Sequence, residues 1–242
     1  STPLYSSAAS DVYKRQDLAV TNGGTGNFYG IYDPNYLKPS ASQVGFMWRT
    51  MYQIIGKANE IIAAAEDLED TPSLRATVSE AKCFRAQSYF LLYRTFDRIW
   101  LNIQPTTAEN VNDPRDFHAA SEKEVFDLIY EDLEYAITNL DWVSDEAGRF
   151  TQAAARHMKA KAALWLKDWD TTLEQVEEIE KSGHFDLIAL NEVFNAGDLN
   201  HKEALMVQQW SKNPGGNLSN ATPKGNYYAA YFIAQYLSLI HI

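Results

Sequence analysis

The chain has 242 residues, of which 45% are hydrophobic and 13% aromatic, so it can bury a sizeable core as one large domain or two small ones. Its formal net charge of −11 argues against a nucleic-acid partner, which needs a basic surface, and against simple electrostatic docking on anionic lipid. The single cysteine, Cys83, excludes an intrachain disulfide, a zinc knuckle and a CxxC redox pair.

The two ends of the chain do not resemble parts of a folded domain. Residues 1–16 and 237–242 resemble translated sequencing-adapter sequence, so native sequence is expected from about Asp17 to about Tyr236. The tails are expected to make few long-range contacts. The sequence contains no apolar run of about 18 residues that would span a membrane, and no signal peptide.

Residues 17–43 are rich in Gly, Asn, Tyr and Pro, a composition typical of a loop. The run Gly23-Gly24-Thr25-Gly26 lacks the Lys-Ser/Thr that a phosphate loop requires. It is therefore predicted to be a flexible turn.

Apolar residues spaced by three and four then predict a helix over 45–68. Its C-terminal end is crowded with acidic residues, which the helix dipole disfavours there. A second helix is predicted over 73–97, opened by Pro72 or Ser73. Its second half is apolar on most sides and is expected to be deeply buried.

A third helix is predicted over 121–141. Ser121 and Glu124 fit a capping box, in which the hydroxyl and the carboxylate satisfy free amides at the helix start.

Two further helices are predicted over 152–167 and 171–182. Thr151 caps the first of them, whose many alanines allow close helix approach, with Trp165 filling the space beyond. The second is expected to end at Ser182-Gly183.

Together these elements predict an all-α fold in which helical hairpins stack in the manner of tetratricopeptide repeats. The helical pattern weakens from His184 onward. Residues 205–210 are read as a short strand or an extended segment.

Two features inside the first two helices point to structural roles. Asn59 is unusual within an apolar helix and is predicted to hydrogen-bond the backbone of a neighbouring loop. Glu80 and Arg85 lie near the seam of the helix pair and are predicted to form a structural ion pair.

No constellation of residues indicates catalysis or a cofactor. The five histidines form no HxxxH or HExxH pair, and no GxSxG elbow is present. Cys83, in mid-helix, is expected to be an inert core thiol. The carboxylates fall on predicted solvated helix faces, and a glycosidase pair depends on tertiary distances that the sequence does not supply. We therefore predict a protein that is not an enzyme and holds no cofactor or metal.

Five segments, in order, resemble the SusD/RagB family of nutrient-binding outer-membrane lipoproteins. Each is weak alone, but their order and spacing make the resemblance specific over about residues 44–210. They are W-x-x-M-Y-x-x-I-x-x-A-N-E-I-I (48–62), E-A-K-C-F-R-A-Q-S-Y-F-x-L (80–92), V-F-D-L-I-x-x-D-L-x-x-A-I (125–137), G-R-F-T-x-x-A-A followed by A-K-A-x-L (148–164), and S-G-H-F-x-L followed by Phe194 and K-E-A-L (182–205).

The sequence also departs from the family pattern. Where the family usually has F-G-x-V-P-L, residues 96–101 read F-D-R-I-W-L, so this corner is expected to turn differently. Family members are about twice this length, so the chain is identified as an N-terminal half, with residues 17–236 as an incomplete SusD-like helical domain.

The resemblance implies a fold of tetratricopeptide-like helix pairs and a lipid anchor at an upstream cysteine. It implies a position on the outer face of the outer membrane, over a TonB-dependent, SusC-like transporter. It implies capture of oligosaccharides or similar nutrients for import, without chemistry.

Aromatic residues of the N-terminal loop, together with Trp100, are the candidate ligand contacts. Sugar rings stack their C–H faces on aromatic rings, while their hydroxyls bond amide side chains. Packing of this loop against the helices is the alternative reading. The candidates are Asn27, Tyr29, Tyr32, Tyr36 and Trp100, whereas helix packing is expected of Trp48, Trp142, Trp165 and Trp169.

Two functional classes stay open: a nutrient-binding lipoprotein that works with a transporter, and a tetratricopeptide-type scaffold that binds a peptide or protein. A helical hydrolase is a distant third. Because the family places part of the ligand face in the half that is missing here, this chain alone is expected to bind glycans weakly or not detectably. Ordering a loop costs about 1–2 kcal/mol per residue, which offsets most of what stacking contributes.

Overall fold

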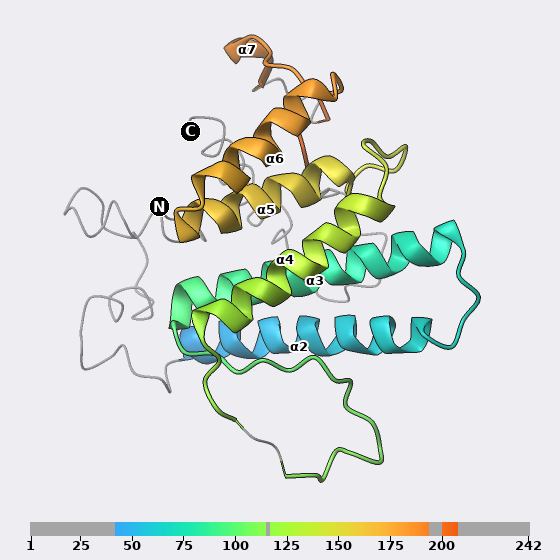
Figure 1. Cartoon of the computed structure of the whole chain (residues 1–242), viewed down its shortest axis with the longest axis vertical. Coiled ribbons are helices and arrows are strands. Elements are labelled where there is room, and N and C mark those ends of the chain that lie inside the picture. Colours follow the sequence, from blue (N-terminus) through green and yellow to red (C-terminus); the bar gives the residue numbers. More distant parts are fainter. Residues whose placement is uncertain (1–41, 115–116, 194–199, 208–242) are drawn as a thin grey trace, which may run out of the picture. The chain divides into compact units, whose positions relative to one another are not determined.

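The structure, a computed structural model, describes residues 42–114, 117–193 and 200–207, and residues 46–206 form one compact unit (Figure 1). The predictions for the tails 1–16 and 237–242 lie outside the described residues. The predicted loop over 17–43 also lies outside them, except for its last two residues, which already belong to a helix.

The chain is all-α, and the five predicted helices are confirmed. The described ranges contain no strand, so the strand reading of residues 205–207 is not supported, and the rest of that segment lies outside them. A single helical turn, which the sequence did not predict, follows the fifth helix. The helices are α2 (Ser42–Ala65), α3 (Pro72–Phe96), α4 (Glu122–Asn139), α5 (Gln152–Leu166), α6 (Trp169–Lys181) and α7 (Leu190–Val193).

Helix α2 ends at Ala65, three residues before the predicted end. The amides of Glu66 and Leu68 bond carbonyls three residues back, as in a tightened final turn. Negative charge at a helix C-terminus opposes the helix dipole, so the acidic run after Ala65 favours this earlier stop.

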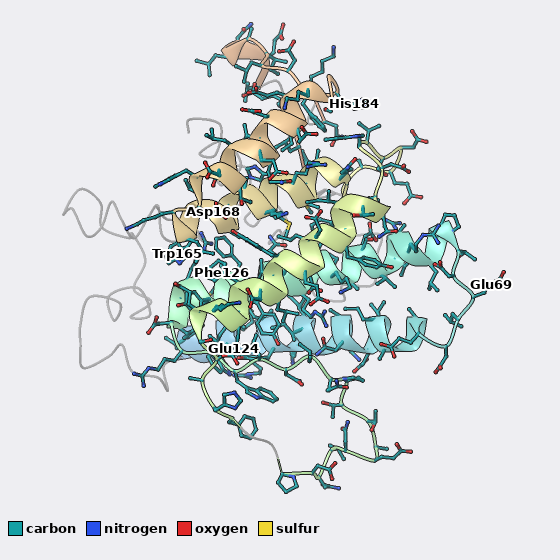
Figure 2. All side chains as sticks on the ribbon, in the orientation of Figure 1. Glu69, Glu124, Phe126, Trp165, Asp168 and His184 are labelled. Atoms are coloured by element: carbon teal, nitrogen blue, oxygen red, sulfur yellow. The ribbon has the colours of Figure 1, made fainter. Side chains whose placement is uncertain are left out.

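The predicted helix starts at Thr71-Pro72, Ser121 and Thr151 are confirmed. The Thr71 and Thr151 hydroxyls accept bonds from amides three residues on, and Ser121 and Glu124 form the full capping box. Glu124 lies at the start of α4 (Figure 2). Hydrogen bonds from the Ser121 hydroxyl and amide lower the pKa of the Glu124 carboxyl.

Helix α6 starts at Trp169, two residues before the prediction. Lys167 has a φ of 62° and ends α5 in a left-handed conformation. This reversal brings Asp168 into the N-cap position, where its carboxylate accepts a bond from the amide of Thr171. The predicted end of α6 at Ser182-Gly183 is confirmed, with Gly183 at a φ of 69°.

Consecutive helices pack together: α3 on α4, α4 on α5, and α5 on α6 (Figure 1). This order agrees with a stack of helical hairpins. Six alanines of α5 are each at most 5% exposed, which confirms close approach through small side chains. None of the described helices is long and apolar enough to cross a membrane. The largest fully buried apolar side chains are Tyr89, Ile55, Leu92, Ile99, Ile129 and Leu133.

Two burial predictions are wrong in part. In the second half of α3, Tyr89 and Leu92 are buried, but Phe84 is 47% exposed. Its ring meets that of Phe150 in a T-shaped arrangement, with their centroids 4.8 Å apart. Trp165 on α5 (Figure 2) packs against the Phe90 ring of α3, with their centroids 6.3 Å apart, but it stays 47% exposed and so fills the space only in part. Apolar periodicity shows that a face can be buried, whereas actual burial needs a partner on that face.

His157 on α5 makes folding sensitive to acid. Burial, and next the nearby Lys161 charge, lower the pKa of His157 to about 4. The folded state therefore resists protonation, so the unfolded state binds more protons between pH 6.5 and 4, and stability falls as the pH drops through this window. We expect a loss of at most about 1.5 kcal/mol from pH 6.5 to 5. Urea unfolding at pH 6.5 and at pH 5 measures this loss. It should disappear in the His157→Gln variant and remain in the control variant His184→Gln.

Candidate ligand-binding surface

Five aromatic side chains gather where α2, the end of α3 and the following loop meet. The centroid of the Trp48 ring lies 4.8 Å from that of the Tyr52 ring and 5.0 Å from that of the Phe96 ring. The Trp100 ring stacks on the Tyr52 ring with their centroids 6.2 Å apart, and the centroid of the Phe117 ring lies 4.9 Å from that of Trp100. We call these five residues the Trp100 cluster.

The Trp100 cluster is open to solvent on one side. Phe117 is 68% exposed, Trp48 is 37% exposed, and Trp100 is partly exposed. Exposed aromatic rings of this kind carry large apolar area that a ligand can cover. The predicted packing role of Trp48 is confirmed by its contacts with Tyr52 and Phe96, but its exposed face was missed.

Two tyrosines, the partly buried Tyr52 and the fully buried Tyr89, hold the loop that carries Trp100. The Tyr52 hydroxyl accepts a bond from the Trp100 amide at 2.9 Å and donates to the Trp100 carbonyl at 2.7 Å. The Tyr89 hydroxyl makes the same pair of bonds with Asn102, both at 2.8 Å. Burial raises the pKa of Tyr52 to about 12 and that of Tyr89 further, so both hydroxyls keep the proton that they donate.

Asn59 is a third anchor of this loop. Its side-chain amide donates to the Asn102 carbonyl at 2.7 Å and to the Gln104 carbonyl at 3.4 Å. The prediction that Asn59 bonds a neighbouring loop is therefore confirmed. Its oxygen accepts a bond from the guanidinium of Arg85 at 2.8 Å, which ties the loop to α3.

A buried ion-pair network stands behind Asn59. The Asp132 carboxylate is fully buried and accepts two bonds from Arg85, both at 2.7 Å, and one from Lys82 at 2.8 Å. The connection thus runs from α4 through α3 and α2 to the loop. Since these groups are buried and fully bonded, they fix the backbone beneath Trp100.

The predicted ion pair between Glu80 and Arg85 is wrong in its partners. Glu80 instead holds Arg149 through two bonds of 2.6 and 2.9 Å. Residues five apart on a helix do not face each other, as residues three or four apart do, so each side chain finds a partner on another segment. Both residues are structural, as expected.

The corner between α3 and the loop turns at Asp97. This residue replaces the glycine of the family pattern, yet it has a φ of 63°, a region that favours glycine. Its amide still bonds the Tyr93 carbonyl, which ends α3 and sends the chain toward Trp100. The corner therefore keeps a glycine-type φ despite the replacement.

A large hollow lies elsewhere, between the start of α3 and residues 138–150. It has a volume of about 810 Å³, and most of its lining is polar. Its charged groups include Arg75, Glu80 and Arg149, which already form ion pairs with acidic or basic neighbours. Among the described residues it has one aromatic wall, the buried Phe150, so it offers less for ring stacking than the Trp100 cluster.

The other predicted site residues have different outcomes. Asn27, Tyr29, Tyr32 and Tyr36 lie outside the described residues, so their role stays a prediction. Cys83 is buried and unbridged, and burial raises the pKa of its thiol. Across the described ranges, no group of three or more His, Cys, Asp or Glu residues is placed to hold a metal ion.

Phe117 was not found from the sequence. It lies in a connecting segment without periodicity, where no local pattern separates an exposed aromatic from a packed one. For Trp48, inside the predicted first helix, only a packing role was expected.

Comparison with known proteins places the chain among SusD-like proteins. Residues 5–164 match the model of a SusD-like family described as "Starch-binding associating with outer membrane". A SusD-like protein of Bacteroides ovatus is 26% identical over 232 residues, which cover 86% of this chain and 41% of that protein. The chain thus spans about two fifths of the length of this relative.

Solved structures share the fold. A SusD-like carbohydrate-binding protein of Bacteroides fragilis superposes with a TM-score of 0.68 at 22% identity, over 78% of this chain and 37% of that one. A laminarin-binding SusD-like protein gives a TM-score of 0.65 at 22% identity, over 77% of this chain and 42% of that one. At this level of identity the likeness establishes the fold alone, and it agrees with the predicted all-α fold.

Proposed function

The chain belongs to the SusD-like family, and on that premise we propose that it serves the non-catalytic capture of glycans or similar nutrients at the cell surface. The Trp100 cluster is the observation that carries this proposal. It combines exposed aromatic rings with a loop whose backbone is already fixed.

Prior fixing of the loop favours binding. A mobile loop would have to be ordered on binding, at about 1–2 kcal/mol per residue. Residues 100–104 are held by Tyr52, Asn59 and Tyr89 without a ligand, so more of the stacking free energy remains as affinity.

The N-terminal loop supplies further proposed contacts. Asn27, Tyr29, Tyr32 and Tyr36 combine amide and aromatic groups, the mixture that a sugar needs. They extend the proposed site but do not carry it.

The partners proposed from the family are an oligosaccharide or other nutrient and a TonB-dependent, SusC-like transporter. The family description, which associates these proteins with the outer membrane, supports a position at its outer face, held by a lipid anchor in the full-length protein. We propose that the protein performs no chemistry. Family membership favours this reading over a tetratricopeptide-type peptide scaffold.

Trp100→Ala should weaken glycan binding. By analogy with bases stacked on aromatic rings, one ring contact contributes about 1–3 kcal/mol, so we expect the affinity to fall by about fivefold to a hundredfold. The fold should survive, because the loop is held through the backbone of Trp100 and not through its ring. Because this chain alone is expected to bind weakly, affinity electrophoresis of the full-length protein against laminarin-, starch- and xyloglucan-derived oligosaccharides measures the change.

Trp169→Ala is the matched control, since Trp169 is 56% exposed on α6 and is not in the Trp100 cluster. It should leave glycan affinity unchanged. Equal losses in the two variants, or a loss in Trp169→Ala alone, would move the site away from the cluster.

A further inference from the structure

A small pocket lies between α3, α4 and α5, apart from the Trp100 cluster. Its volume is about 100 Å³. Apolar side chains such as Ile129, Leu133 and Met158 form much of its wall, and Arg94 and Lys161 bring positive charge to it. None of the described residues that line it is acidic, although acidic residues outnumber basic ones by 32 to 21 in the chain.

The two cations have different surroundings. The Arg94 guanidinium lies over the Phe90 ring, 4.5 Å from its centre, and Phe90 also lines the pocket. Lys161 is partly buried on α5 and forms no ion pair or hydrogen bond with any other described residue. Burial, and next the charge of Arg94, lower the pKa of Lys161 to about 8.

A partly buried ammonium beside a second cation is unfavourable, because burial removes water and like charges repel. An anion beside Lys161 would offset both the cost of its burial and its repulsion by Arg94. The apolar wall would strengthen the attraction, since charges interact more strongly where water is excluded. Lys161 is thus suited to an anionic partner that the described chain does not supply.

We propose that this pocket, the Lys161 pocket, binds one anionic group of the size of a carboxylate or a sulfate. A volume of about 100 Å³ corresponds to about three water molecules, which suits such a group but not a whole sugar ring. Arg94 and Lys161 would donate charge-assisted hydrogen bonds to its oxygens. The site is separate from the glycan surface, and it would read the acidic substituent of a ligand or a free ion.

Sulfate is the first probe, added to the 242-residue chain and followed by NMR. The His157 ring signals are the reporter, because the Lys161 charge lowers the pKa of His157. We expect saturable shifts with a dissociation constant of roughly 1 mM, and a rise in the His157 pKa, because bound sulfate offsets the Lys161 charge. In Lys161→Met the affinity should fall at least about tenfold.

Lys159→Met is the matched control, since Lys159 lies on the same helix but already pairs with Glu134. It should keep the sulfate affinity. Lys161→Met should also raise the midpoint of thermal unfolding, because it removes an uncompensated charge. This second measurement tests the proposal even if sulfate binds weakly. Sulfate shifts that survive in Lys161→Met, or a lowered midpoint in that variant, would overturn the proposal.

Acetate, glucuronate and glucose separate the sources of the anion. Glucose should not bind at the Lys161 pocket. Glucuronate at least as tight as acetate would identify acidic sugars as the ligand. Glucuronate much weaker than acetate would identify a free ion, because the sugar ring is then excluded. Glucose binding that depends on Lys161 would refute an anion site.

Discussion

Asp132→Ala should lower the free energy of unfolding by about 3–5 kcal/mol, the largest effect that we expect from one substitution. The carboxylate is fully buried and is shared by Arg85 and Lys82, which are themselves at most 8% exposed. Without it, two cations remain in the core with no anion, and removing one partner of a buried pair is strongly destabilising. Urea unfolding with linear extrapolation measures the loss.

Asp127→Ala is the control on the same helix, because Asp127 pairs with Lys123 in full solvent exposure. It should change stability by no more than about 0.5 kcal/mol. A second control replaces the whole network with apolar side chains: Lys82→Met, Arg85→Met and Asp132→Leu together should recover much of the loss. An Asp132→Ala variant as stable as Asp127→Ala would contradict a structural role for the network.

The helices could be predicted because most of them follow local sequence rules. A bound could not be predicted where it depends on an unusual backbone conformation. The start of α4 depends on Ser121 and Glu124, which lie within one turn of each other, so the sequence contains the whole capping interaction. The start of α6 depends on Lys167 adopting a left-handed conformation, which is uncommon for a non-glycine residue, so no local pattern indicated it.

The candidate site could be predicted only where a residue conflicts with its surroundings. Asn59 stands out because a polar side chain in an apolar helix must find a hydrogen-bonding partner. The sequence alone does not identify that partner. The partners of Asn59 are 26 and 43 residues away, and Arg85 lies 47 residues from Asp132. Such pairings follow from the packing of α2, α3 and α4, which a single sequence does not reveal.

The same packing links stability to the proposed function. The buried pair fixes Arg85, Arg85 orients Asn59, and Asn59 holds the backbone beneath Trp100. Asn59 is therefore a positioning residue: it touches no ligand in the proposed site but sets where the aromatic ring lies.

Asn59→Leu should lower the free energy of unfolding by about 2–4 kcal/mol. It leaves Arg85 one acceptor short, removes the donor of the Gln104 carbonyl, and leaves the Asn102 carbonyl with Tyr89 alone. Asn59→Leu should also release the loop over residues 100–104. A loss of global stability alone would leave this loop in place under native conditions. Fluorine NMR of fluorotryptophan-labelled protein, with the signal assigned through Trp100→Phe, should show the Trp100 resonance shifted or broadened.

Asn59→Asp separates the two roles of this side chain. A carboxylate still accepts the bond from Arg85, but it cannot donate to the carbonyls of Asn102 and Gln104. We expect a smaller loss of stability than in Asn59→Leu, with a similar change in the Trp100 resonance. Asn139→Leu, which removes only a local bond to the Tyr135 carbonyl, should leave the resonance unchanged. A Trp100 signal that stays native in Asn59→Asp would show that Tyr52 and Tyr89 hold the loop without Asn59.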